Sequence, residues 1–142
     1  DFLNDCGAGY AVVYKAPEGR WAINGVSFFG RRFGSPEPPS EDFSIFICDK
    51  DFAVIREVRK PYGTFDREAA RWYRIDFDPV AVPEVFYVCI YFNANTYKGV
   101  YAHKDKSVGS THSFFAIPYT FVGDVDAKFD WMIRAHLVKA GS

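Results

Sequence analysis

Cysteine is scarce in this sequence, and neither sign of charge is in marked excess. The three cysteines do not make a disulfide framework, and none of them has the Cys-x-x-Cys spacing of a zinc or redox site. Seventeen Lys and Arg against eighteen Asp and Glu leave a formal net charge of -1. A polyanion such as DNA therefore meets no overall positive field, and we expect no nucleic-acid partner.

Long apolar runs and helical patterns are also missing. The longest apolar stretches, such as residues 85–92, are far shorter than the roughly 20 residues that a helix needs to cross a bilayer. Apolar residues nowhere recur with helical spacing over many positions, so we expect no substantial helix and no membrane insertion. No basic segment followed by an apolar one opens the printed sequence, which leaves an extracellular or periplasmic location open.

Motifs for catalysis and metal binding are absent as well. The sequence has no Gly-x-Ser-x-Gly elbow, no phosphate-binding glycine loop and no His-Glu-x-x-His motif, so we predict no catalytic residue. His103 and His112 would meet only across neighbouring strands, and as polar surface residues they predict no metal centre. We expect no cofactor, with calcium as the alternative. Oxygen-rich loops hold calcium in sandwiches, and solvated strand ends explain the same acidic residues equally well: Glu41, Asp42, Asp49 and Asp51.

Aromatic residues are abundant, at 19% of the chain, and they favour sheets. Runs rich in Val, Ile, Phe and Tyr alternate with turns that contain Gly, Pro and Asp, which is typical of short strands. One run is apolar on both faces and predicts a strand in the middle of a sheet. The expected strands cover residues 9–16, 21–34, 43–48, 52–58, 71–79, 84–93, 98–105, 111–119 and 130–139.

This pattern predicts an all-β fold, an antiparallel two-sheet β-sandwich of jelly-roll type, with a closed barrel as the alternative. The length fits one domain over residues 1–142, with a loose N-terminal segment at 1–8 and a C-terminal tail at 140–142. Cys48 and Cys89 lie in apolar strands and are expected to be buried thiols, or a disulfide if the protein is exported. The predicted core is Ile23, Val26, Phe28, Ile45, Ile47, Val54, Ile75, Val88, Ile90, Val100, Phe114, Ile133 and Leu137.

Several segments together resemble a known pattern: APEGRWAINGVSFFGRRFG, EDFSIFICDKDF, KPYGTF, VPEVFYVCIYFNANTYKGVY and DWMIRAHL. They are similar to an uncharacterised bacterial β-sandwich accessory domain found at the C-terminal ends of larger exported or membrane-linked proteins. The resemblance covers residues 7–137 and departs from the pattern at Gly30–Gly34 and at Pro118. It implies an accessory role within a larger protein and no particular reaction.

Aromatic and hydrogen-bonding residues gather at the expected loops and strand ends. Sugar rings have apolar faces and outward hydroxyls, so a carbohydrate site needs flat rings with polar groups beside them. The sequence therefore predicts a non-catalytic carbohydrate-binding module, with a polysaccharide-active enzyme and a structural or protein-interaction module as alternatives. Arg134, in the middle of a strand, is expected to be half-buried and paired with a carboxylate. The candidate ligand-binding residues are Tyr62, Tyr97 and Tyr101 for stacking, and Arg32, Asn93, Lys98 and Asp105 for polar contacts.

Overall fold

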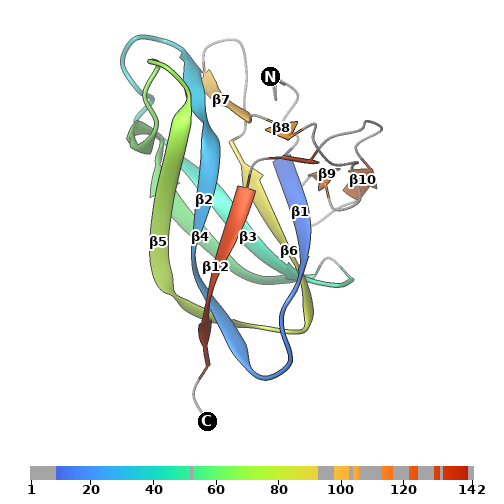
Figure 1. The fold of residues 1–142 in the computed structure, drawn as a ribbon. Coiled ribbons are helices and arrows are strands. Elements are labelled where there is room, and N and C mark those ends of the chain that lie inside the picture. The colour runs from blue at the N-terminus through green and yellow to red at the C-terminus, as the bar shows by residue number, and fades with distance from the viewer. Residues whose placement is uncertain are drawn as a thin grey trace.

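A computed structural model describes the backbone of residues 9–51, 53–92, 98–102, 104–105, 113–116, 122–124, 130–131 and 133–140, and the side chains at 10–51, 53–92, 99–100 and 133–140. Antiparallel strands form two main sheets that pack face to face (Figure 1). The strands are β1 (Gly9–Lys15), β2 (Trp21–Gly34), β3 (Asp42–Asp49), β4 (Val54–Pro61), β5 (Arg71–Val82), β6 (Val85–Tyr91), β7 (Lys98–Ala102), β8 (Lys104–Asp105), β9 (Ser113–Ala116), β10 (Val122–Asp124), β11 (Asp130–Trp131) and β12 (Ile133–Lys139).

The larger sheet has the strand order β10-β9-β1-β6-β3-β4. The run that is apolar on both faces forms β6, which pairs with β1 on one side and with β3 on the other. This central position is the one expected of a strand without a polar face. β3 and β4 form a hairpin. The Asp49 carboxylate closes its turn by accepting backbone N–H hydrogen bonds from Asp51 and Ala53, both at 2.9 Å.

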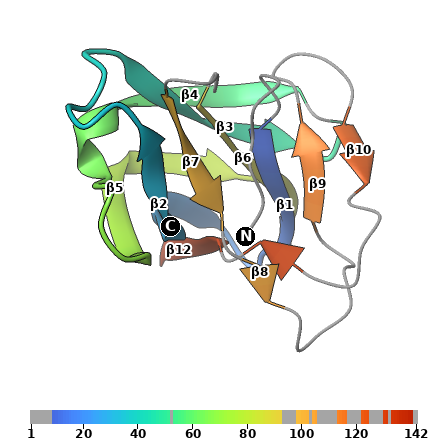
Figure 2. The same cartoon turned by 90° about the horizontal axis from the view of Figure 1, so that it is seen from above.

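The smaller sheet is built around the long strand β2, which pairs with β5 along one edge. Along its other edge β2 pairs first with β12, over residues 21–28, and then with β7, over residues 30–34. Between β1 and β7 the chain changes sheet at every connection except the β3–β4 hairpin, and Figure 2 shows the two layers that result. The predicted antiparallel two-sheet β-sandwich is confirmed, and its jelly-roll type stays a prediction.

The core lies between the sheets and is rich in aromatic rings. Phe28, Phe43, Phe65 and Phe92 are buried and contact one another at tilted or edge-to-face angles, with ring centres 5.2 to 5.7 Å apart. Such pairs stabilise a core by about 0.5–1.5 kcal/mol beyond the area that they bury. Tyr10 crosses from the larger sheet and donates its hydroxyl to the Val100 carbonyl at 3.0 Å. The hydroxyls of core tyrosines therefore find partners without leaving the apolar layer.

A second apolar cluster lies apart from this core and contains Ala11, Phe46, Cys48 and Cys89, with Val54 packed against it. Val54 was expected in the main core and belongs to this smaller cluster instead. Both cysteines are buried free thiols, as expected, and they do not form the alternative disulfide. Burial raises the pKa of Cys48 to about 12 and raises that of Cys89 as well, so both stay protonated at neutral pH.

Several strand boundaries differ from the expected ones. β5 was expected to end at Pro79 but continues to Val82, because residues 77–79 oppose only Asn24 at a bulge and the missing N–H of proline breaks no ladder there. β7 and β8 lie within the run 98–105, and β11 and β12 within the run 130–139; residues 103 and 132 between them lie outside the described part of the chain. Of the predicted core, Phe114 lies outside the described side chains, and Leu137 is partly buried against the core.

Residues 1–8 lie outside the described part of the chain, and the single-domain organisation stays a prediction. Within the described part, no helix has the length and apolar character needed to cross a bilayer.

Candidate functional site

Polar and aromatic side chains share the surface of the smaller sheet that faces away from the core. On β5, Tyr73 and Ile75 are buried, so the alternate residues Trp72, Arg74 and Asp76 lie on the opposite surface. The side chains of β2 and β12 alternate in the same way. Residues on these strands whose sequence neighbours belong to the core therefore lie on the same surface as Trp72, Arg74 and Asp76. We call this surface the outer face, formed by Ser27, Phe29, Trp72, Arg74, Asp76, Arg134 and His136.

Trp72 is at the centre of the contacts on the outer face. Its ring meets the Phe29 ring edge-on, with centres 5.4 Å apart, because Phe29 and Trp72 are directly paired between β2 and β5. The guanidinium of Arg134 reaches across β2 from β12 and lies 4.3 Å from the centre of the Trp72 ring. Arg134 was expected to be half-buried and paired with a carboxylate. It is exposed and stacks on an aromatic ring instead.

His136 and Ser27 form a hydrogen bond on the same face, with 2.6 Å between Nε2 and Oγ. The pair resembles a nucleophile with its base, but Ser27 lies in mid-strand and is paired with Arg134 on one side and Arg74 on the other. Backbone N–H groups around Ser27 are therefore used by the sheet and do not form an oxyanion hole. This geometry favours ligand contact over nucleophilic catalysis.

The charged residues among those that define the outer face are two arginines and one aspartate. Asp76 supplies the acidic group of this face, and its carboxylate is 2.9 Å from Nε of Arg74. Arg134 adds a second guanidinium. Partial burial, followed by the positive charge of Arg74, lowers the pKa of His136; Asp76 opposes this effect and Arg134 adds to it. A neutral imidazole beside two arginines is therefore the favoured state.

Gly25 allows β2 and β5 to approach closely beneath this surface. A Cβ at Gly25 would lie 2.9 Å from the backbone oxygen of Ile75 and 3.1 Å from Oδ1 of Asp76. Both distances are shorter than ordinary van der Waals contact, and the first involves backbone that cannot swing away. Gly25 lies at the β2–β5 bulge, where it pairs with Asp76 on one side and with His136 on the other. The absence of a side chain at this position allows the close approach of the strands.

Comparison with protein-family models, with curated proteins and with solved structures found no match for this chain. The resemblance to a bacterial accessory domain therefore stays a prediction, and the functional argument depends on the chemistry of the described residues.

Two of the candidate ligand-binding residues are buried in the structure. Tyr62 belongs to the 3-10 turn Tyr62–Thr64, is 0% exposed and donates its hydroxyl to the Phe92 carbonyl. Burial raises the pKa of this hydroxyl. Arg32 is 3% exposed and donates to the carbonyls of Ser35 and Pro36 at 2.6 and 3.0 Å. In this structure, neither side chain presents its ring or its guanidinium to a ligand.

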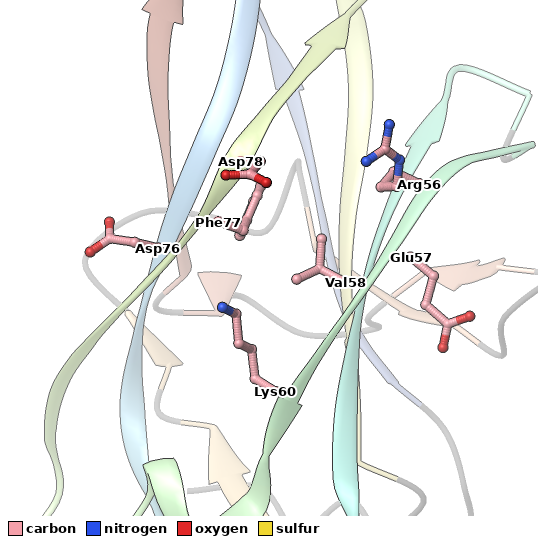
Figure 3. Close-up of a pocket in the computed structure, with 7 residues that line it drawn as sticks. All are labelled: Arg56, Glu57, Val58, Lys60, Asp76, Phe77 and Asp78. Atoms are coloured by element: carbon pink, nitrogen blue, oxygen red, sulfur yellow. The ribbon is translucent and has the colours of Figure 1, made fainter.

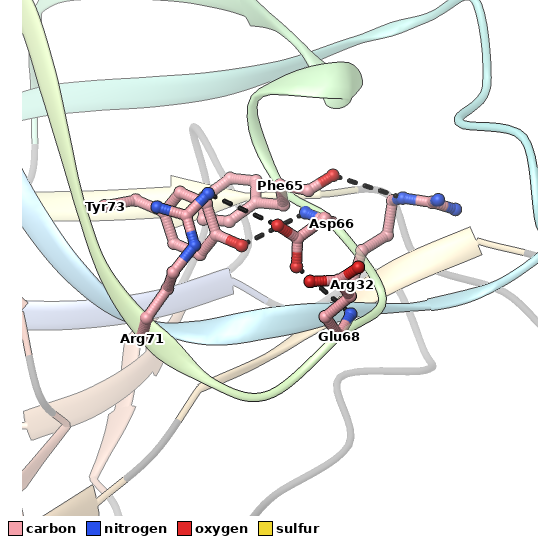
Figure 4. Close-up of polar contacts among 6 residues, drawn as sticks. All are labelled: Arg32, Phe65, Asp66, Glu68, Arg71 and Tyr73. Atoms are coloured by element: carbon pink, nitrogen blue, oxygen red, sulfur yellow. Dashed lines mark hydrogen bonds and ion pairs between the residues drawn. The ribbon is translucent and has the colours of Figure 1, made fainter.

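Arg32 instead helps to hold a corner of the sandwich together, as Figure 4 shows. Its backbone N–H donates to the Asp66 carbonyl at 2.8 Å, and its Nε contacts the Phe65 carbonyl at 3.4 Å. The Asp66 carboxylate accepts from the Glu68 N–H at 3.1 Å and from Arg71 at 3.3 Å, and these contacts lower its pKa despite partial desolvation. The corner thus ties the segment before β5 to the end of β2.

The other candidates lie on β7 and β8 or outside the described residues. On β7, Lys98 pairs with Gly34 and Tyr101 with Arg31 through the backbone. On β8, Asp105 pairs with Asp130 of β11. Asn93 and Tyr97 lie outside the described residues, as do the histidines at 103 and 112 considered for a metal. The structure therefore does not bring the seven candidates together in one described site.

The acidic residues considered for calcium include Asp49, whose carboxylate closes the β3–β4 turn. Among the described residues there is no group of three or more His, Cys, Asp or Glu side chains close enough to hold a metal. Calcium binding stays an untested alternative.

A separate groove of about 570 Å³ lies between β4 and β5, the end strands of the two sheets (Figure 3). Val58 and Phe77 give it an apolar floor, and Lys60 extends into it from β4. Asp76 and Glu57 also border the groove. The Asp76 carboxylate is in an ion pair with Arg74 on the outer face, and the Glu57 carboxylate is in an ion pair with Arg59 on β4. Charged side chains at such open edges commonly prevent strands from pairing with other molecules.

Sequence reasoning singled out Arg134, but as the partner of a carboxylate, and did not bring together the residues that define the outer face. Trp72 carried a usable signal, because it is an aromatic residue at a polar position of an alternating strand. His136 and Ser27 carried none, since they are 109 positions apart and only the register of β12 against β2 brings them together.

Proposed function

We propose that this chain is a non-catalytic binding module that receives carbohydrate on its outer face. The observation that carries the proposal is the position of Trp72, an aromatic ring on the solvent side of a sheet with Phe29 at its edge and Arg134 over it. Trp72 is partly exposed, and the part of its ring that Arg134 and Phe29 leave uncovered offers apolar area to sugar C–H groups at a low cost in conformational entropy.

The polar residues of the outer face support the same proposal. Arg74, Asp76 and Arg134 are exposed, and Ser27 and His136 are partly exposed. Together they present donors and acceptors of the kinds that hydroxyl-rich ligands need. A rigid sheet holds all of them, so binding would order little chain, which favours affinity. The accessory role implied by the family resemblance belongs to this proposal.

A second candidate function is protein interaction, and the groove between β4 and β5 is the observation that favours it. In the described part of the chain, the edge of β4 that faces away from β3 and the edge of β5 that faces away from β2 have no pairing partner. An extended segment of another protein would find backbone hydrogen-bonding groups and an apolar floor there. The charges that line the groove make this the weaker candidate.

The test is retention of the purified protein on a panel of insoluble and soluble polysaccharides, with analysis of the supernatant for released sugars. Carbohydrate binding through the outer face predicts retention that Trp72→Ala abolishes. Ile55→Ala is the matched control, because Ile55 is an exposed hydrophobic residue on β4 of the other sheet. Released sugars would indicate an enzyme. Retention unchanged by Trp72→Ala would remove the outer face from the proposal.

A further inference from the structure

We propose that the outer face selects acidic glycans, whose carboxylate or sulfate oxygens bind the guanidinium of Arg134; this inference rests on the carbohydrate-binding function proposed above. It names the class of ligand and the residue that distinguishes acidic from neutral sugars. Three structural features support it: the stacking of Arg134, the charges around it and the local character of those charges.

Stacking on Trp72 prepares Arg134 for an anion. A free arginine side chain samples many rotamers, and a ligand that binds it must restrict them at an entropic cost. Here the guanidinium already lies 4.3 Å from the ring centre, which restricts its position before a ligand arrives. Its planar set of N–H donors matches the two oxygens of a carboxylate or sulfate, a geometry that the point charge of a lysine does not provide.

The charges beside Arg134 also favour an anion. Arg74 lies on the opposite side of β2, and both arginines pair with Ser27 through the backbone. The acid on this face, Asp76, is already in an ion pair with Arg74, so Arg134 is the guanidinium left for the ligand. Burial is the main cause of the lowered pKa of His136, and the charges of Arg74 and Arg134 lower it further. An anion would reduce the repulsion among these groups.

The positive region is local, because the whole chain has a formal net charge of -1. A linear polyanion therefore gains little from long-range attraction, and binding should depend on sugar rings that fit beside Trp72. This separates an acidic glycan from a polyanion that lacks sugar rings. Inorganic polyphosphate is a suitable probe of that difference.

The experiment measures dissociation constants for two pairs of polymers that share a backbone. Polygalacturonate is compared with its methyl ester, and dextran sulfate with dextran, while polyphosphate serves as the ring-free polyanion. The protein variants are Arg134→Gln, Arg134→Lys and the control Arg59→Gln. Arg59 is an exposed arginine in an ion pair with Glu57 on the other sheet, so its replacement removes an equal charge without changing a residue of the outer face.

We expect at least one acidic polymer to bind about tenfold or more tightly than its neutral counterpart, as one charge-assisted hydrogen bond would give. Arg134→Gln should remove this preference and Arg134→Lys most of it, whereas Arg59→Gln should leave it intact. The two acidic arms show whether carboxylate or sulfate is the preferred group. Circular dichroism and the melting temperature establish whether each variant is folded. If Arg134→Gln does not fold, Arg134→Lys still tests the proposal.

Three results would overturn the proposal in distinguishable ways. Equal binding of the acidic and neutral polymers would contradict the selection of anions and leave carbohydrate binding standing. Polyphosphate binding as tight as that of the acidic glycans would contradict the requirement for a sugar. Binding of none of the five polymers would contradict this inference, while retention on other polysaccharides that depends on Trp72 would still support the broader function.

Discussion

The guanidinium of Arg134 lies 4.3 Å from the centre of the Trp72 ring, and the whole width of β2 separates the strands that carry them. This contact joins all three strands at the outer face, since Phe29 of β2 touches the same ring. The relationship matters for function because it orders both a flat aromatic surface and a cation on one rigid sheet.

A double-mutant cycle should detect this contact as a coupling free energy. We expect Trp72→Ala and Arg134→Ala to interact by about 0.5–1 kcal/mol, the usual value for an exposed cation–π pair. Urea unfolding of the wild type, both single variants and the double variant gives the four free energies required. Strictly additive effects would mean that the two side chains do not stabilise one another in solution.

Replacement of Gly25 by alanine should destabilise the fold. The new Cβ would lie 2.9 Å from the Ile75 backbone oxygen, and relief of that overlap must move β2 or β5. We expect a loss of about 1–3 kcal/mol in the free energy of unfolding, typical of overpacking. Gly63→Ala is the control, because its Cβ would meet nothing closer than 3.8 Å, at Pro38. Equal stability of the two variants would show that the β2–β5 bulge is not tightly packed.

Tyr62→Phe separates a structural role from a ligand-binding role. The hydroxyl of Tyr62 is buried and donates to the Phe92 carbonyl, so its removal leaves that acceptor without its partner. We expect a cost of about 1–3 kcal/mol in stability and no change in glycan affinity for the folded variant. Chemical denaturation and a binding titration provide the two measurements. A large loss of affinity in a stable Tyr62→Phe variant would restore Tyr62 as a ligand contact.

Local sequence patterns were sufficient for much of the fold and for little of the site. Sequence patterns placed Ile75 of β5 in the core, and the apolar run of β6 predicted its central position. Tyr62 was misleading because a tyrosine between Pro61 and Gly63 is typical of an exposed loop, whereas a 3-10 turn directs it into the core. Contacts such as Arg134 with Trp72 depend on strand register, which a local pattern does not contain.

The pKa of His136 responds to burial and to the charges on the outer face. Burial and the charges of Arg74 and Arg134 lower it from 6.5, while Asp76 opposes them. The neutral form is therefore favoured by folding. His136 contributes stability that is present above about pH 6.5 and is lost as the pH falls through its lowered value.

Proton NMR of the histidine ring, assigned with His136→Gln, should show this lowered pKa. Arg74→Gln should raise it, because the variant removes a positive charge and releases the Asp76 carboxylate from its ion pair. Arg59→Gln, on the other sheet, should leave it unchanged. A pKa of His136 that does not respond to Arg74→Gln would contradict the influence of these charges on His136.

Chemical-shift mapping with an acidic oligosaccharide tests the proposed site most directly. Addition of oligogalacturonate to isotope-labelled protein should shift the signals of Trp72, Arg134 and their neighbours on β2 in a saturable manner, and Arg134→Gln should reduce the effect. Shifts confined to the groove between β4 and β5, or no shifts at any concentration, would contradict binding of acidic glycans at the outer face.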